Sequence, residues 1–138
     1  MGNRIRIGGG SSKVTASLRV FGEWLDPEDI SRQLGCLPTS TTRKGDPLSY
    51  GRVSDIGMWS LQEDGSTIPE TVVDALLAKL TPDLAVWHEL GSKYRMDIFC
   101  GVFFGSENEG SGGFSLSPTL VQSLAERGLE IGFDIYWD

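Results

Sequence analysis

The residues best suited to chemistry in this chain lie in one loop, Arg43-Lys44-Gly45-Asp46-Pro47. An arginine presents a planar fork of donors that fits a carboxylate or a phosphate, and a nearby glycine lets the backbone turn sharply. The alternative is a solvated turn in which Arg43 pairs with an acidic neighbour. The residues alone favour the turn, but we keep Arg43, Lys44 and Asp46 as candidate residues for binding a ligand or a partner.

Two of the four tryptophans join these candidates. Trp24 precedes a predicted helix and is the tryptophan best placed to be an exposed binding anchor. Trp59 fits an inward position of a predicted strand, and a ligand pocket lined by the charged loop would lie near it. Trp87 and Trp137 fit core positions, so we expect them to be structural.

The remaining residues give catalytic and metal chemistry little support. His88 is the single histidine, and no G-x-S-x-G segment accompanies it. Cys36 and Cys100 are far apart and cannot complete a typical zinc site with His88 alone. Carboxylates are plentiful, but a sequence does not show whether two of them converge in one pocket. We expect no catalytic residue, no metal and no cofactor, which favours a non-enzymatic role and leaves catalysis open.

Length and charge narrow the class of protein and partner. The 138 residues fit one domain, and 12 Lys+Arg against 19 Asp+Glu give a net charge of −7. This balance disfavours nucleic-acid binding, which needs a surface that neutralises phosphates, and it suits a basic protein partner. Neither a secretory signal nor an apolar run of membrane-spanning length is present, so we expect a cytoplasmic protein with reduced thiols and no membrane contact. The oligomeric state stays open.

Two strand–helix junctions share one plan. Leu25-Asp26-Pro27 and Leu116-Ser117-Pro118 each place a capping side chain directly before a proline, which favours the start of a helix. Ile30 and Val121 lie at hydrophobic-staple spacing, so we predict that they pack against buried Leu25 and Leu116. Gly35 should end the first helix in a left-handed conformation.

Hydrophobic periodicity predicts a single α+β domain over residues 14–138, after a flexible lead-in at 1–13. We expect a mostly antiparallel sheet with helices on one face, and we consider a ferredoxin-like topology with a helical insert. The predicted strands cover 14–21, 55–62, 95–104 and 130–137, with 114–116 pairing back on the third. The predicted helices cover 27–34, 69–80, a short segment that starts at Thr81-Pro82, and 118–127. Residues 39–52 form a long polar connection, and 106–113 an exposed, mobile loop.

Several spaced motifs run along nearly the whole chain from about Val14. They are Leu18-Arg19-Val20-Phe21-Gly22, Leu25-Asp26-Pro27, Leu34-Gly35 with Pro38-Thr39, Arg43-Lys44-Gly45-Asp46, Trp59-Ser60-Leu61, Asp97-Ile98-Phe99-Cys100-Gly101, Leu116-Ser117-Pro118 and Leu129-Glu130-Ile131-Gly132-Phe133-Asp134-Ile135-Tyr136. Together they resemble the bacterial domain-of-unknown-function 4279 family. The resemblance implies a small cytoplasmic single-domain protein without an assigned reaction. It also retains the charged tetrapeptide at 43–46, which favours a site over a plain turn.

These observations leave two hypotheses. The first is a non-enzymatic binding protein, immunity-type or regulatory, that meets a basic protein partner. Some families of this size and acidity are immunity proteins to bacterial toxins. This analogy rests on the size and charge of the chain, and no shared sequence motif supports it. The second is an enzyme domain that binds a small molecule or an anion in a pocket beside the Arg43–Asp46 loop.

Overall fold

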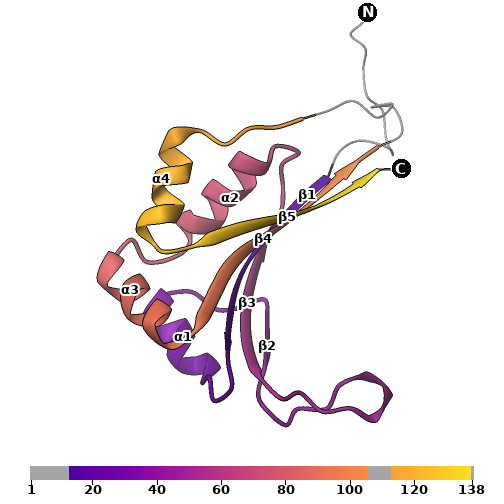
Figure 1. Cartoon of the computed structure of the whole chain (residues 1–138), viewed down its shortest axis with the longest axis vertical. Helices are drawn as coiled ribbons and strands as arrows, with labels where there is room; N and C mark the ends of the chain where they lie inside the picture. The colour runs from indigo at the N-terminus through magenta and orange to yellow at the C-terminus, as the bar shows by residue number, and fades with distance from the viewer. Residues whose placement is uncertain (1–12, 106–112, 138) are drawn as a thin grey trace, which may run out of the picture.

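A computed structural model describes residues 13–105 and 113–137, where four helices cover one face of a five-stranded sheet (Figure 1). This confirms the predicted α+β class. The strands are β1 (Lys13–Gly22), β2 (Ser40–Thr42), β3 (Gly57–Glu63), β4 (Arg95–Phe104) and β5 (Glu130–Trp137). The helices are α1 (Pro27–Leu34), α2 (Pro69–Ala78), α3 (Leu84–Lys93) and α4 (Pro118–Glu126), and η1 (Ser49–Gly51) is a single 3₁₀ turn.

The sheet has the order β2-β3-β1-β4-β5. β1 is antiparallel to both β3 and β4, β2 is antiparallel to β3, and β5 is parallel to β4. The first four strands with α1 and α2 follow the β-α-β-β-α-β order of a ferredoxin-like unit, in which α3 is inserted and to which α4 and β5 are added. The helical insert considered from the sequence is therefore α3 alone, and α4 and β5 lie outside the ferredoxin-like unit.

The predicted pairing of residues 114–116 with β4 is wrong, because this segment forms no strand. The outer edge of β4 is occupied by β5. Ser117 is also held at α2, where its backbone N–H donates to Glu70 Oε1 at 2.6 Å and its hydroxyl donates to Glu70 Oε2 at 2.7 Å. The chain before α4 is thus attached to a helix, on the helical side of the sheet.

The core lies between the sheet and the helices, as the alternation in β1 predicts. Leu18 stands between Leu61 of β3 and Ile98 of β4, and all three are buried. An apolar stripe of α2 is buried too: Val72, Val73, Leu76, Leu77 and, just after the helix, Leu80. The other face of the sheet carries no helix in the described part of the chain (Figure 1). There Arg19 and Asp97 form a two-pronged ion pair with both N···O distances at 2.8 Å.

Both predicted caps are present. Asp26 Oδ1 accepts from the backbone N–H of Glu28 at 3.1 Å, and Ser117 Oγ accepts from that of Leu120 at 3.2 Å. Gly35 ends α1 with φ 76°, as predicted. Leu25 and Ile30 are buried at the first junction.

At the second junction the predicted staple is wrong, because Val121 is 50% exposed. α4 turns Leu120 and Leu124 toward the core instead. These two residues are four positions apart and share one face, so Val121 lies about 100° around the helix from Leu120. The helix phase is set by which residues meet the core, not by the spacing to the preceding leucine.

α3 also begins later than predicted. Its cap is Asp83, whose Oδ1 accepts from the backbone N–H of Ala85 at 3.0 Å. Thr81 bonds elsewhere: its backbone N–H donates to Leu34 O at 2.9 Å, its Oγ1 accepts from the backbone N–H of Asp83, and its carbonyl accepts from Trp87 Nε1 at 2.8 Å. The Thr81-Pro82 pair therefore forms the turn before the helix. Among the described residues, no helix is long and apolar enough to cross a membrane.

Candidate functional site

Residues 43–56, which we call the arm, leave the sheet between β2 and β3 as a projecting hairpin (Figure 1). The sequence predicts only a long polar connection here. Backbone hydrogen bonds hold its two sides together: the N–H of Gly45 donates to Ser54 O at 2.7 Å, and the N–H of Ser54 donates to Asp46 O at 2.8 Å. Pro47 and Val53 form an isolated bridge further out. The arm is therefore an ordered extension of the sheet.

The tip of the arm presents a tyrosine in a conformation that tyrosine rarely adopts. Tyr50 has φ 63° and ψ 35°, and Gly51 follows with φ 74°. Two successive positive φ values are typical of the I′ hairpin turn, in which Asn or Gly usually occupies the first position. A non-glycine residue there costs on the order of 1–2 kcal/mol. Tyr50 is 96% exposed, so packing against the described part of the chain does not offset this cost.

At the base of the arm, Arg43 joins the arm to the start of α1. Its guanidinium pairs with Glu28 and, at 3.4 Å, with Asp26. Its backbone N–H donates to Asp46 Oδ2 at 2.8 Å. Hydrogen bonding with Glu28 raises the pKa of Arg43, and hydrogen bonding with Glu28 followed by the charge of Arg43 lowers the pKa of Asp26. Asp46 therefore shapes the turn, while the charge of Arg43 is directed at α1.

Lys44 makes the second link at this base. Its ammonium pairs with Glu23 and lies 4.2 Å from the centre of the Trp24 ring. Trp24 is 77% exposed, as expected for a binding anchor, and the cation above the ring restricts its orientation. The structure thus brings together Arg43, Lys44, Asp46 and Trp24 from two segments of the chain.

Trp59 lies elsewhere, wholly inside the core. Its indole N–H donates to Ser31 Oγ on α1 at 2.9 Å. Ser31 also lines a hollow of about 290 Å³, formed by Pro27, Glu28, Ser31, Leu37, Pro38 and Thr41. The charged group of this lining is the carboxylate of Glu28, which already binds Arg43. Trp59 can thus support the floor of the site but cannot touch a partner.

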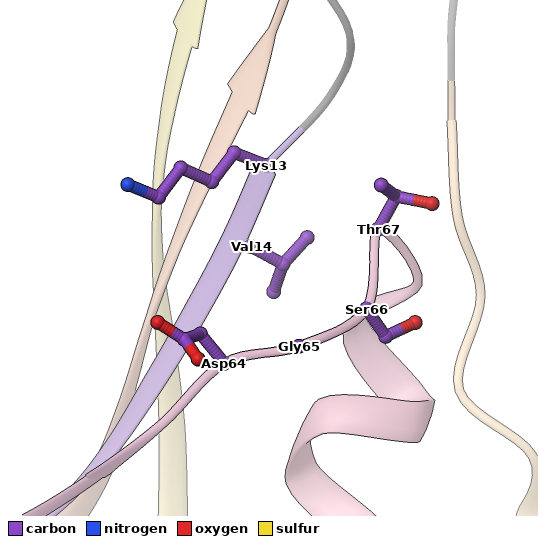
Figure 2. A pocket seen from close by; sticks show the side chains of 6 residues that line it. All are labelled: Lys13, Val14, Asp64, Gly65, Ser66 and Thr67. Carbon is purple, nitrogen blue, oxygen red and sulfur yellow. The ribbon is translucent and has the colours of Figure 1, made fainter.

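A second hollow, of about 300 Å³, lies between the beginning of β1 and the turn after β3 (Figure 2). Its lining consists of Lys13, Val14, Asp64, Gly65, Ser66 and Thr67. Figure 2 shows the amine of Lys13 pointing away from the turn and the hydroxyls of Ser66 and Thr67 pointing outward on the other side. The polar groups do not converge, so this hollow offers no chemical centre.

The residues that could react are scattered. His88 Nε2 lies 2.9 Å from the carbonyl oxygen of Glu126, on the helical side. Cys100 is buried, and burial raises the pKa of its thiol to about 11, which leaves it protonated and unreactive near neutral pH. Within residues 13–105 and 113–137, no group of three or more His, Cys, Asp or Glu could hold a metal ion.

Sequence reasoning missed the exposed apolar residues of the arm and of the loop after α1. Leu37, Leu48, Tyr50 and Val53 all present large side chains to solvent. One signal was available in the sequence. Ser49-Tyr50-Gly51 is a turn-forming triplet between two isolated apolar residues, which is typical of a hairpin tip.

A family model described as Domain of unknown function (DUF4279) matches residues 12–138. The chain belongs to this family. The resemblance seen in the motifs is therefore confirmed, and the DUF4279 match includes the arm, α4 and β5. No curated protein and no solved structure matches the chain.

Proposed function

We propose that this DUF4279 protein is a non-enzymatic binding protein that contacts a protein partner through the tip of the arm and Trp24. The observation that carries the proposal is Tyr50, a strained residue whose side chain is almost fully exposed. Backbone strain concentrates at functional positions, and a solvent-exposed tyrosine gains nothing from it in the free chain. Tyrosine and tryptophan are the usual anchors of protein interfaces.

The acidic residues before the arm and the charge of the whole chain support a basic partner. Residues 23–56 contain six acidic and four basic side chains, and the whole chain has a net charge of −7. The two cations at the base, Arg43 and Lys44, are already paired with carboxylates. An acidic binder of this kind would associate quickly with a basic surface, which suits an immunity-type or regulatory protein.

The same ion pairs count against the alternative, an enzyme domain that binds an anion. A site for a phosphate or carboxylate ligand needs cationic donors that are free to meet it. Arg43 is held by Glu28 and Asp26, and the adjacent hollow presents the carboxylate of Glu28 to any ligand. The arrangement therefore suits a structured protein-binding surface better than an anion pocket.

The test is affinity capture with the tagged full chain in a lysate of the native host, followed by quantitative mass spectrometry. Tyr50→Asn removes the anchor and places at that position a residue that tolerates positive φ, while Trp24→Ser removes the second anchor. Val121→Ser, a half-exposed site on α4, is the matched control.

We expect a basic protein that is captured by wild type and the control and reduced at least tenfold by both anchor variants. Circular dichroism should show that all three variants are folded. Equal capture by all four proteins would contradict the proposal. Calorimetry that shows phosphate bound by wild type and not by Arg43→Ala would support the anion site instead.

A further inference from the structure

β5 is the outer strand on its side of the sheet, and no described segment of the chain pairs with its outer edge. It pairs with β4 over eight consecutive residues, from Glu130 opposite Asp97 to Trp137 opposite Phe104. No other strand lies beyond it in the described ranges 13–105 and 113–137, and within them no backbone hydrogen bond joins β5 to a segment other than β4. Such an edge presents a row of N–H and C=O groups that another chain can pair with.

Several of the usual protections of an edge strand are missing from β5, although it carries Glu130 and Asp134. Its sequence Glu-Ile-Gly-Phe-Asp-Ile-Tyr-Trp contains no lysine, arginine or proline, and its pairing runs without a bulge. α4 lies beside the beginning of the strand, whereas the last residues extend past it (Figure 1). Ile135, Tyr136 and Trp137 are 46%, 47% and 50% exposed, although Tyr136 and Trp137 stack on aromatic rings of β4.

The two faces of this edge differ in chemistry. The pairing register puts Ile131, Phe133 and Ile135 on the face that carries the helices. Glu130 and Asp134 lie on the uncovered face, in line with Asp97 and Gly101 of β4. Asp134 already accepts a hydrogen bond from the Tyr136 hydroxyl, which leaves its other oxygen for a partner. The edge therefore has an apolar side and an acidic side.

We propose that the outer edge of β5 accepts an extended segment of a partner protein as a sixth strand, and that this segment alternates basic and apolar side chains. Backbone pairing gives such an addition its affinity, and alternate side chains give it specificity. Basic side chains stand opposite Glu130 and Asp134, and apolar ones lie beside Phe133 and Ile135. A second copy of this chain fits less well, because it would bring another −7 of net charge and a second acidic edge.

The test uses fluorescence anisotropy of a labelled ten-residue peptide of alternating lysine and valine, titrated with the full chain. A glutamate–valine peptide is the charge control and should bind at least tenfold more weakly. Two further probes are N-methylated versions of the lysine–valine peptide, one methylated at every valine and the other at every lysine. In a paired strand the backbone N–H groups of alternate residues face the same side, so only the valine or only the lysine N–H groups face β5. One probe should therefore lose at least tenfold in affinity and the other should not. Equal binding of the parent peptide and both methylated probes would overturn the proposal.

Variants place the site on β5. Ile135→Lys adds a positive charge to the edge and should reduce binding at least tenfold, whereas Val121→Lys makes the same change at a similarly exposed site on α4 and should not. Equal loss in both variants would contradict the assignment.

In sedimentation the wild-type chain should be a monomer. A dimer abolished only by Ile135→Lys would mean that the edge pairs with a second copy of the chain, and it would overturn the proposal. Tyr50→Asn should leave peptide binding unchanged, so failure here is distinct from failure of the arm as a binding surface.

Discussion

The arm and the end of β5 both expose aromatic side chains, but the molecule holds them by different means. Tyr50 projects from a two-residue turn that is closed by backbone hydrogen bonds within the arm. Trp137 stacks on Phe104 with ring centres 4.5 Å apart, and Tyr136 on Phe103 at 4.7 Å, so β5 depends on β4. Truncating side chains in the arm should therefore weaken binding with little loss of stability, whereas truncating side chains in β5 should reduce both.

The largest contrast should come from truncating one apolar residue in each region. Phe133 packs against the core and against Phe114, with ring centres 5.0 Å apart, so Phe133→Ala should lower the free energy of unfolding by about 2–3 kcal/mol. Leu48→Ala in the arm should change it by less than about 0.5 kcal/mol. Urea titrations of both variants check this. Similar losses would show that the arm is part of the cooperative core.

The second contrast concerns the two thiols. Cys100 faces the core opposite Phe133, and burial raises its pKa to about 11. In the unfolded chain a thiol ionises near pH 8.5, so the stability that the protonated Cys100 contributes below that pH is lost as the pH rises toward 11. The loss is on the order of 2–3 kcal/mol.

Urea titrations of wild type and Cys100→Ala at pH 8 and pH 10.5 measure this loss, which should shrink in the variant. Cys36→Ala, at the end of α1, is the control and should behave as wild type. A thiol reagent at pH 8 should label half-buried Cys36 before Cys100. Equal labelling rates would contradict the difference in burial.

A third prediction tests the strain at the tip of the arm. Tyr50→Gly should raise the free energy of unfolding by about 1 kcal/mol, because glycine adopts positive φ without the cost that tyrosine has. Greater flexibility of glycine in the unfolded chain reduces the gain. Thermal and urea unfolding measure the change. A clear destabilisation would mean that the tyrosine side chain stabilises the free protein, and the argument for a partner contact would lose its basis.

The smallest effect is expected for Arg43→Ala, since its ion pairs are exposed and exposed pairs contribute little. The variant should unfold at a slightly lower urea concentration at pH 7 and low salt. The pKa of Asp26 is lowered in the folded chain. The ionised carboxylate therefore contributes to the free energy of unfolding above the ordinary Asp pKa of about 3.9, and this contribution disappears as the pH falls through the lowered pKa.

The difference between wild type and Arg43→Ala should therefore vanish in strong acid and in 0.5 M salt. A difference that persists in both conditions would mean that Arg43 acts through packing. Asp46→Ala and the double variant extend this test. A double variant that loses less than the sum of the two single losses, with binding intact, would show that the two residues form a structural clamp and not a site.

Part of the site was readable from the sequence and part was not. Arg43, Lys44 and Asp46 lie close together in the chain, and Trp24 directly precedes the segment that caps α1, so local reasoning could name all four as candidates. Tyr50 was missed because the argument for it rests on a backbone angle: the sequence Ser-Tyr-Gly indicates a hairpin tip but not that the tyrosine has a positive φ. Trp59 was placed inward correctly, but its complete burial and its bond to Ser31 depend on where α1 packs.

By itself, the sequence determined the elements whose signals are local. α1 and β4 have the predicted bounds, and Asp26, Ser117 and Gly35 cap as predicted, because caps and periodicity act within a few residues. Only the tertiary structure decided that β5 pairs in parallel with β4, that α3 begins at Leu84, and that Val121 faces solvent while Leu120 is buried. Each of these depends on contacts between segments far apart in the chain. The free energies of these contacts outweigh the conformational preferences of single residues, and local sequence patterns do not indicate which distant segments will pack together.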